Sequence, residues 1–336
     1  MTIIILICIS VCAGAQGADS LGGMVTRRTA WPMRILDGAL DLRDRIVKND
    51  SLYISRVPQK IKLGLAVNCS GAEIEARGAG LEAGDFRTML SSEMKTTMSV
   101  NVAYRGLGIG LKANPAKIFG KKASTELNMS FYGNRIGIDA VYQSSGNYKG
   151  NILSTGEKVY VPAGMVNMEM FMVNTYYAFN ARRFSYPAAF TQSWIQHRSG
   201  GSILAGLSYS LGKLGAAADE ELGNAPMTLR TSFGSIGVGY GYNFAMKKMW
   251  LLHLSAIPQV VVYSHNRLRI GDDSEKAPYR FPDVLMVGRI SLVHHFGKYY
   301  VGMAGKVTTT TIGDRERLLL NNVKWMGQVS FGIKLK

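Results

Sequence analysis

Apolar and polar residues alternate along most of this chain with a period of two. The last sixteen residues, NNVKWMGQVSFGIKLK, put Val323, Trp325, Val329, Phe331, Ile333 and Leu335 in one parity and Lys324, Gln328, Ser330, Lys334 and Lys336 in the other. Successive side chains of a β-strand point to opposite faces, so this ending predicts a strand with one apolar and one polar face. A helix would mix the two sets.

The same alternation recurs from Lys60 onward and predicts about twelve strands, within a range of ten to fourteen. The clearest segments are 61–68, 97–104, 107–111, 126–131, 203–211, 235–243, 249–264, 283–297 and 298–311. The candidate turns at 245–248 and 297–298 are short, whereas those at 212–230 and 265–282 are long and polar. One rim of short turns and one rim of long loops is typical of a membrane barrel. The stretch 146–164 is expected to be a long connection.

The composition of the two faces indicates which solvent each one meets. The polar parity holds mostly Gly, Ser, Ala and Asn, which suits a crowded interior. The apolar parity places aromatic residues near the expected strand ends, as in the girdles of membrane barrels: Tyr104, Tyr142, Trp194, Tyr240, Trp250, Tyr263, Tyr299 and Trp325. A sheet in hydrocarbon must close so that every backbone group is paired. We therefore expect an all-β fold, a closed antiparallel transmembrane β-barrel in a bacterial outer membrane. The alternative is a soluble barrel or sandwich.

The N-terminal region differs from the rest. Residues 1–15 have an apolar stretch followed by Ala13-Gly14-Ala15 and predict a secretory signal peptide, although Cys12 allows a lipoprotein interpretation. Residues 16–55 predict a periplasmic or plug-like extension with a short amphipathic helix, and 56–336 the barrel. Cleavage after Ala15 leaves Cys69 as the single cysteine, which excludes a disulfide framework.

Several stretches together resemble one family: DSLYISRVPQK, NARRFSYPAAFTQSWIQHRSGGS, SYSLGK, GYGYN and KKMWLLHLSAIPQVVVY. The chain is similar over about 50–336 to an uncharacterised family of Bacteroidota proteins, a domain of unknown function regarded as an outer-membrane β-barrel. The resemblance implies location and architecture. It brings no ligand, reaction or catalytic residue.

The sequence offers weak candidates for chemistry. His253 and Ser255 have the His-x-Ser spacing of the outer-membrane phospholipase barrel, where a base and a nucleophile share a strand face. Alternation points both into the lumen, and no Asn partner is obvious, so we expect a hydrogen-bonded lumen histidine. His294 and His295 should face opposite sides and cannot share a metal. The glycines of 106–111 and 237–242 lead into no helix and are interpreted as inward glycines that relieve crowding. No cofactor or metal is expected.

The chain carries a formal net charge of +16. Five basic residues fall on the expected inner face: Lys62, Arg289, Lys306, Lys324 and Lys334. Few acids, such as Glu126 and Asp139, oppose them. A lumen lined this way would favour an anionic small solute, and the alternative is that basic residues at the rims pair with anionic lipid. Lys and Arg are spread along the chain, which argues against nucleic acid.

The expected partners are outer-membrane lipid, lipopolysaccharide and the barrel-assembly machinery. The function predicted is passive transport, small-ligand binding or envelope structure. A lipid-modifying enzyme of the phospholipase or acyltransferase type is the alternative.

Overall fold

The computed structural model describes residues 38, 49–59, 61–78, 86–104, 107–113, 125–154, 157–216, 227–270, 273–277, 283–314 and 318–335. The chain divides into two compact units, Met1–Lys48 and Asn49–Lys336, and the second is described here. The predicted signal peptide and the predicted amphipathic helix lie outside the described residues. The predicted extension 16–55 ends within a short strand of the second unit, β1 (Ile54–Arg56).

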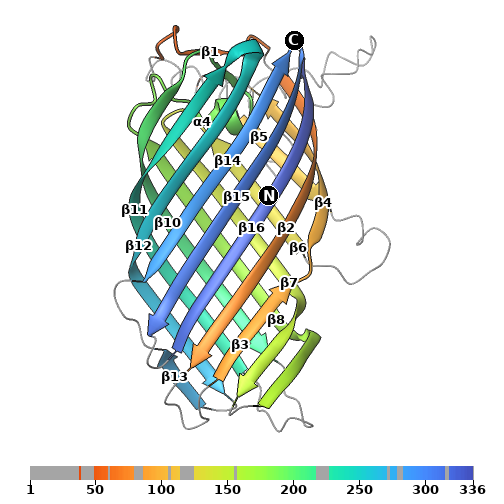
Figure 1. The fold of residues 1–336 in the computed structure, drawn as a ribbon, viewed down its shortest axis with the longest axis vertical. Coiled ribbons are helices and arrows are strands. Elements are labelled where there is room, and N and C mark those ends of the chain that lie inside the picture. Colours follow the sequence, from red (N-terminus) through yellow and green to blue (C-terminus); the bar gives the residue numbers. More distant parts are fainter. Residues whose placement is uncertain are drawn as a thin grey trace, which may run out of the picture. The chain divides into compact units, whose positions relative to one another are not determined.

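The second unit is a closed antiparallel β-barrel (Figure 1). Its long strands are β2 (Ile61–Gly78), β7 (Ile136–Ser154), β8 (Glu157–Ala178), β10 (Gly200–Ala216), β11 (Met227–Met246), β12 (Trp250–Ile270), β14 (Val284–Phe296), β15 (Tyr299–Asp314) and β16 (Leu318–Leu335). The shorter strands β3 (Phe86–Ser92), β4 (Lys95–Tyr104), β5 (Leu107–Ala113), β6 (Thr125–Tyr132) and β13 (Asp273–Ala277) complete the sheet. β16 pairs with β2 along its whole length and closes the ring.

The wall between β2 and β7 differs between its two ends. At one end β3 alone joins them, pairing with β2 and with β7, which makes a hydrogen-bonded ring of 10 strands. At the other end β4 pairs with β2, β5 pairs with β4, and β6 pairs with β7. β4 follows β3 after two residues and runs in the same direction along β2. The closed barrel that the sequence predicts is confirmed, and its ring of ten is within the range of ten to fourteen strands.

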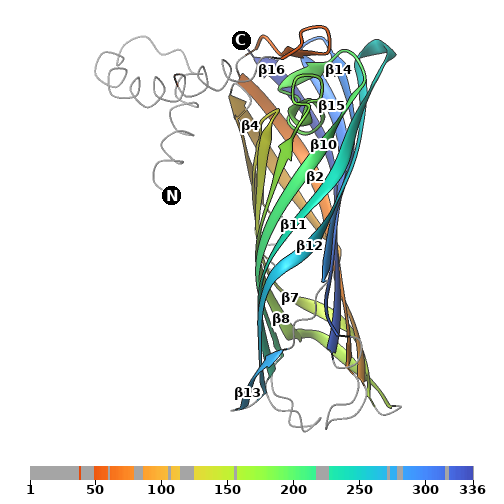
Figure 2. The ribbon, with the colours of Figure 1, turned by 90° about the vertical axis from the view of Figure 1, so that its left-hand side faces the viewer.

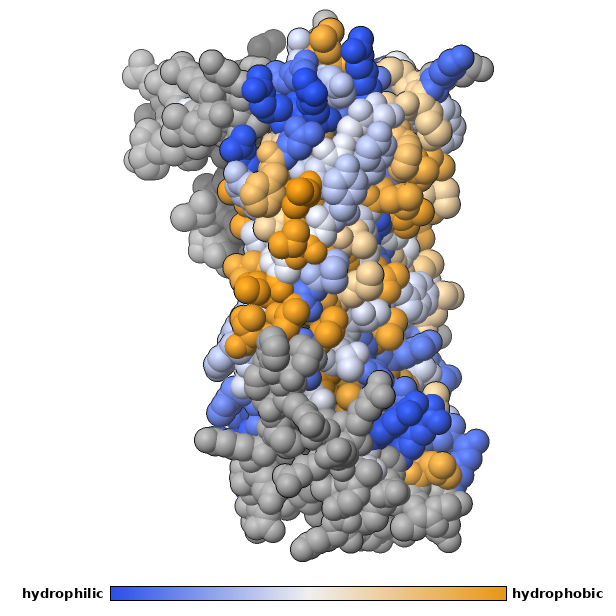
Figure 3. Space-filling view, turned by 60° about the vertical axis from the view of Figure 1, so that its left-hand side comes forward, coloured by the Kyte–Doolittle hydropathy of each residue, from blue (hydrophilic) through white to orange (hydrophobic). Residues whose placement is uncertain are grey.

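The outer face of the barrel carries the apolar parity. Leu65, Val238 and Leu207 are 63%, 62% and 56% exposed, and they belong to a belt of apolar residues around the middle of the barrel (Figure 3). Hydrophilic residues border this belt in the view shown. A sheet with this surface can exist only in lipid, because no second layer of protein covers the belt in the part of the chain the structure describes. Among the described residues, no helix is long and apolar enough to cross a membrane.

The two ends of the barrel have different connections. Short turns such as 133–135, 247–249 and 297–298 lie at the end where β16 finishes (Figure 1). The described residues that flank 217–226 and 278–282, two segments of longer connections, lie at the other end. By the usual arrangement of membrane barrels, the short turns mark the periplasmic end and the longer connections the extracellular end. The expected long connection at 146–164 is wrong, since β7 and β8 extend through most of it.

A segment between β8 and β10 folds into the periplasmic end, as Figure 2 shows for α4. We call residues 179–199 the plug segment. It contains the helix α4 (Tyr186–Phe190), whose N-cap Ser185 accepts a hydrogen bond from the backbone N–H of Ala188. It also contains β9 (Trp194–Gln196), which pairs with β1. Trp194, expected in an aromatic girdle, instead belongs to this segment and packs against apolar residues inside the barrel.

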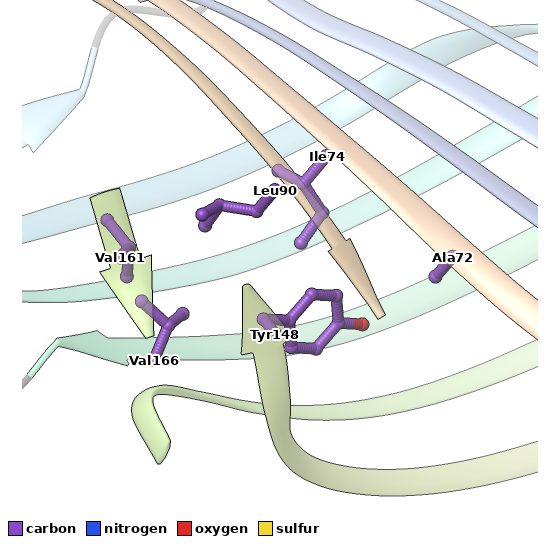
Figure 4. Close-up of a cluster of buried hydrophobic side chains, with 6 residues drawn as sticks. All are labelled: Ala72, Ile74, Leu90, Tyr148, Val161 and Val166. Atoms are coloured by element: carbon purple, nitrogen blue, oxygen red, sulfur yellow. The ribbon is translucent and has the colours of Figure 1, made fainter. Parts of the chain in front are cut away.

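Two clusters of apolar side chains lie in the extracellular half of the interior. One cluster joins Ala72, Ile74, Leu90, Tyr148, Val161 and Val166 from β2, β3, β7 and β8 (Figure 4). A second cluster joins Phe233, Val261, Leu285, Val287 and Ile312. The interior is therefore layered, with apolar residues in the extracellular half and the plug segment in the periplasmic half.

Candidate functional site: a basic cavity beneath the plug

Four of the five basic residues predicted to face the lumen surround one interior cavity. Lys62, Arg289, Lys306 and Lys324 line a space of about 190 Å³ together with Thr191 and Gln192 of the plug segment. These cations come from β2, β14, β15 and β16, so the barrel brings together positions far apart in the sequence. Alternation within each strand directs them inward. The fifth residue, Lys334, is buried at 6% exposure beside this group.

One carboxylate balances part of this charge. Asp139 of β7 is 3% exposed and forms an ion pair with Arg289 through Oδ2. Lys306 approaches the same oxygen at 3.4 Å, and the Tyr132 hydroxyl donates to Oδ1. The side chain of Glu126, the other acid expected inside, lies outside the described set. Among the described residues lining the cavity there are four basic side chains and one carboxylate.

A second basic group lies where β2 meets β16. Lys62 and Lys334 are directly opposite in the sheet register, and both point inward. Lys62 donates to the backbone carbonyl of Thr191 and to Ser193 Oγ, the latter at 3.0 Å. His295 is 6% exposed, interacts electrostatically with both lysines, and has no hydrogen-bond partner on either ring nitrogen in the described structure. Like charges opposite each other destabilise a sheet, so this pairing is unfavourable by itself.

The His253–Ser255 pair is part of a longer hydrogen-bond chain. Asn243 Oδ1 lies 2.7 Å from His253 Nδ1, His253 Nε2 lies 2.9 Å from Ser255 Oγ, and Ser255 Oγ lies 2.8 Å from the Tyr186 hydroxyl. Asn243 donates from Nδ2 to the Ser185 carbonyl, which fixes its amide so that Oδ1 faces the imidazole. In a neutral imidazole Nδ1 then carries the proton, and Nε2 accepts from the serine. This is the proton arrangement of a base and its nucleophile.

Asn243 is the residue that the sequence analysis missed. It lies on β11 directly opposite His253 of β12. A signal was available, because these two strands form a hairpin around the short turn 247–249, where Met246 pairs with Trp250. Counting outward from that turn pairs Asn243 with His253.

The same chain anchors the plug segment to the wall. Tyr186 of α4 also lies 3.4 Å from Arg289 Nη1, and its ring stacks on Tyr176 with centroids 4.1 Å apart. Ser291 donates to the Ala189 carbonyl at 2.7 Å. His253 and Asn243 are fully buried, and neither they nor Ser255 line the cavity. The hydrogen bonds of Asn243, His253 and Ser255 resemble those of a catalytic group, but these side chains are enclosed between the plug segment and the barrel wall.

The remaining sequence candidates are placed as follows. His294 stacks on Trp250 with ring centroids 4.4 Å apart, while His295 points into the barrel, so the two histidines face opposite sides. A Cβ added to Gly237 would lie 2.0 Å from the Pro258 carbonyl oxygen, which agrees with a glycine that relieves crowding. Within the described residues, no group of three His, Cys, Asp or Glu side chains could hold a metal ion.

Solved structures with similar shape are bacterial barrel proteins with very low sequence identity. The outer-membrane protease OmpT from Escherichia coli has a TM-score of 0.48 and 10% identity, over 84% of this chain and 98% of that chain. The translocator domain of the autotransporter NalP from Neisseria meningitidis has a TM-score of 0.35 and 9% identity, over 92% and 98%. The toluene transporter TodX of P. putida has a TM-score of 0.28 and 8% identity, over 83% and 91%. No activity transfers at these identities. No curated protein is significantly similar to the chain.

The closed ring, the apolar belt and the difference in loop length between the two ends identify the chain as an outer-membrane β-barrel. A comparison with family models also identifies its family. Because the model described as "Domain of unknown function (DUF4421)" matches residues 48–334, the chain belongs to that family.

Proposed function

We propose that this barrel binds a small anion in its lumen and does not act as an open diffusion pore. The observation that carries the proposal is the cavity beneath the plug segment, where Lys62, Arg289, Lys306 and Lys324 meet one carboxylate among the described residues, Asp139. Lys62 and Arg289 are buried, and burying a cation is costly unless an acidic group or a bound anion joins it. A cavity of about 190 Å³ suits a ligand of the size of phosphate, sulfate or a short carboxylate.

The layered interior supports ligand binding over free diffusion. The plug segment occupies the periplasmic side of the cavity through Thr191 and Gln192. Apolar clusters around Tyr148 and Phe233 lie on the extracellular side. A general porin instead holds a water-filled polar lumen. Movement of the plug segment would be needed to release a bound anion toward the periplasm.

Titration calorimetry on the folded full-length barrel in detergent tests the proposal. The probes are sodium phosphate, sodium sulfate and sodium acetate, with choline chloride as the comparison for salt alone. We expect at least one of the three anions to bind, and the variant Lys306→Gln/Lys324→Gln to weaken that binding at least tenfold. The matched control is Lys149→Gln/Lys158→Gln, which removes two exposed lysines. If none of the anions binds at millimolar concentration, or if both double variants bind equally, the proposal is wrong.

Planar bilayers test the closed state. The intact barrel is expected to pass little current, and replacing residues 185–192 with a Gly/Ser linker is expected to open an anion-preferring conductance. A cation preference after this replacement would contradict a basic lumen.

A lipid-modifying enzyme is the second candidate, because Asn243, His253 and Ser255 form a base and nucleophile chain. Phospholipase and acyltransferase assays on purified protein test it, with Ser255→Ala as the active-site variant. Ser291→Ala is the matched control, since Ser291 also hydrogen-bonds to the plug segment but donates to the Ala189 carbonyl and not to the imidazole. Loss of a measured activity in Ser255→Ala alone would favour the enzyme.

The route to the membrane belongs to the proposal as well. Export by cleavage after Ala15 and insertion by the barrel-assembly machinery are supported by the N-terminal apolar stretch and by the regular alternation of β16. The resemblance noted in the sequence implies a bacterium of the Bacteroidota. The mass of the mature N-terminus tests the cleavage.

A further inference from the structure

Three basic residues lie side by side on the outer face near the extracellular end. Lys213 of β10 is directly opposite Arg230 of β11, and Arg230 is directly opposite Arg267 of β12. The sheet register thus places one cation on each of three adjacent strands at the same level. All three side chains are exposed.

No ion pair among the described residues holds any member of this row, although Glu169 lies in the same groove. The three side chains form no hydrogen bond or ion pair with any described residue, unlike Arg77 and Arg87 on β2 and β3, which share Glu75. Glu169 of β8 lies opposite Lys213 in the register without forming an ion pair in this part of the chain. Like charges directly opposite one another destabilise a sheet. An external anion would remove this repulsion.

The row lies at the edge of the apolar belt. Two residues toward the periplasm from Lys213, the exposed Leu211 begins the lipid-facing parity of β10, and Tyr209 follows it. The Tyr209 hydroxyl lies 3.0 Å from Ser232 Oγ on β11. Tyrosines at this level mark the headgroup region of a membrane. The basic row is one step farther out, on the side of the longer connections.

A shallow groove connects the charges to the apolar surface. It has a volume of about 470 Å³, and its lining includes Lys213, Arg230, His265 and Arg267 together with Phe171 and Leu211. A free phosphate would use the cations and leave the exposed Phe171 and Leu211 without a partner. A lipid with a phosphorylated headgroup satisfies both, since its phosphates reach the cations while its acyl chains cover the apolar residues.

We propose that Lys213, Arg230 and Arg267 form a binding site for the phosphorylated headgroup of an outer-leaflet lipid, the lipid A part of lipopolysaccharide. Lys presents a point charge and Arg two donors in a plane, so one row can hold two phosphate groups. The site is on the outer face and is independent of the anion cavity in the lumen.

Native mass spectrometry of the full-length barrel in detergent tests this site with three probes: bisphosphorylated lipid A, the same lipid after dephosphorylation, and inorganic phosphate. The test variant is Lys213→Gln/Arg230→Gln/Arg267→Gln. The matched control is Arg77→Gln/Arg87→Gln, which removes two exposed cations that share an ion pair with Glu75. A gel shift between heated and unheated samples verifies that each variant is folded.

We expect lipid A to bind the wild-type barrel and the control variant equally. Each basic residue at an anionic lipid surface changes affinity about fivefold, so the triple variant should lose roughly 100-fold. Should the triple variant fail to fold, Arg230→Gln alone is expected to lose about fivefold. Equal binding of lipid A by wild type and variant, equal binding of the dephosphorylated lipid, or equal loss in the control would each overturn the site. Binding of inorganic phosphate as tight as that of lipid A would also overturn it.

Discussion

Asp139 is the carboxylate on which the charge balance of the lumen depends. It contacts Arg289 and Lys306 through one oxygen and Tyr132 through the other. The substitution Asp139→Asn keeps a side chain of the same shape and an oxygen that can accept from Tyr132. It removes the negative charge and turns the acceptor Oδ2, which meets Arg289 and Lys306, into an amide donor. The change therefore isolates the electrostatic role of this residue from its packing.

The size of the effect follows from burial. The side chains of Asp139 and Arg289 are each 4% exposed, so the guanidinium loses its partner in a place where water cannot replace it. Removing one member of a buried ion pair costs about 3–5 kcal/mol. Lys306 is 17% exposed and can turn toward the cavity, which relieves part of the repulsion. We expect the free energy of unfolding to fall by about 3 kcal/mol.

Urea-induced unfolding in lipid vesicles, followed by tryptophan fluorescence, measures this loss. The double variant Asp139→Asn/Arg289→Met should be more stable than Asp139→Asn alone, because the buried cation is then absent. The control is Glu93→Gln, which breaks an exposed ion pair with Lys149 and should cost less than about 0.5 kcal/mol. A loss below about 1 kcal/mol in Asp139→Asn, or a double variant less stable than the single one, would refute the reasoning.

The same substitution has an opposite effect on ligand binding. With Asp139 neutral, the cavity lining has four cations and no carboxylate among its described residues. Anion affinity in calorimetry should therefore rise while stability falls. A variant that loses both would indicate that Asp139 contacts the ligand itself.

Three further predictions concern other parts of the barrel. Gly237→Ala should lower the unfolding free energy by about 2 kcal/mol, because its new Cβ meets backbone at 2.0 Å, whereas Gly327→Ala meets nothing within 4 Å and should cost less than about 0.5 kcal/mol. Tyr186→Phe removes the hydroxyl that joins α4 to the wall and should cost about 1 kcal/mol, with faster hydrogen exchange confined to the plug segment. On the outer face beyond the apolar belt, the hydrogen bond from Arg77 lowers the pKa of Glu75. This exposed contact stabilises the fold by about 0.5 kcal/mol at neutral pH, and the contribution disappears as the pH falls through that lowered pKa. Urea midpoints of Glu75→Gln and wild type should therefore differ at pH 7 and converge at low pH.

The alternation of apolar and polar residues predicts the barrel because the surrounding lipid requires one face of each strand to be apolar. Where a strand extends beyond the hydrocarbon, no solvent requires one parity to be apolar, and the sequence of β7 and β8 around 146–164 loses the pattern although the strands continue. The plug segment was not predicted, for a related reason. Three residues around Trp194 have the pattern of a strand that faces lipid, but they form β9, which pairs with β1.

The candidate site was predictable strand by strand but not as a group. Parity alone directs Lys62, Arg289, Lys306 and Lys324 inward, and the structure places them there. Their common cavity depends on how the ends of the chain close, because Lys62 of β2 lies beside the strand of Lys324 only through the pairing of β2 with β16. No local pattern carries that register. Asn243 is the exception, since a hairpin with a short turn fixes its partner.

The barrel wall between β2 and β7 holds a different number of strands at each end. β3 lies between them at one end, and β4, β5 and β6 lie between them at the other. The widths of the two mouths, which are equal in a uniform barrel, can therefore differ. Each strand adds about 4.8 Å to the circumference, so the two additional strands β5 and β6 enlarge the periplasmic mouth by roughly 10 Å while the extracellular girth stays at ten strands. Deleting these two strands would change the room available for the plug segment without changing any strand pairing at the extracellular end. The diameter of this barrel can thus differ between its two ends, whereas the strand number of a barrel ordinarily fixes one diameter along its whole length.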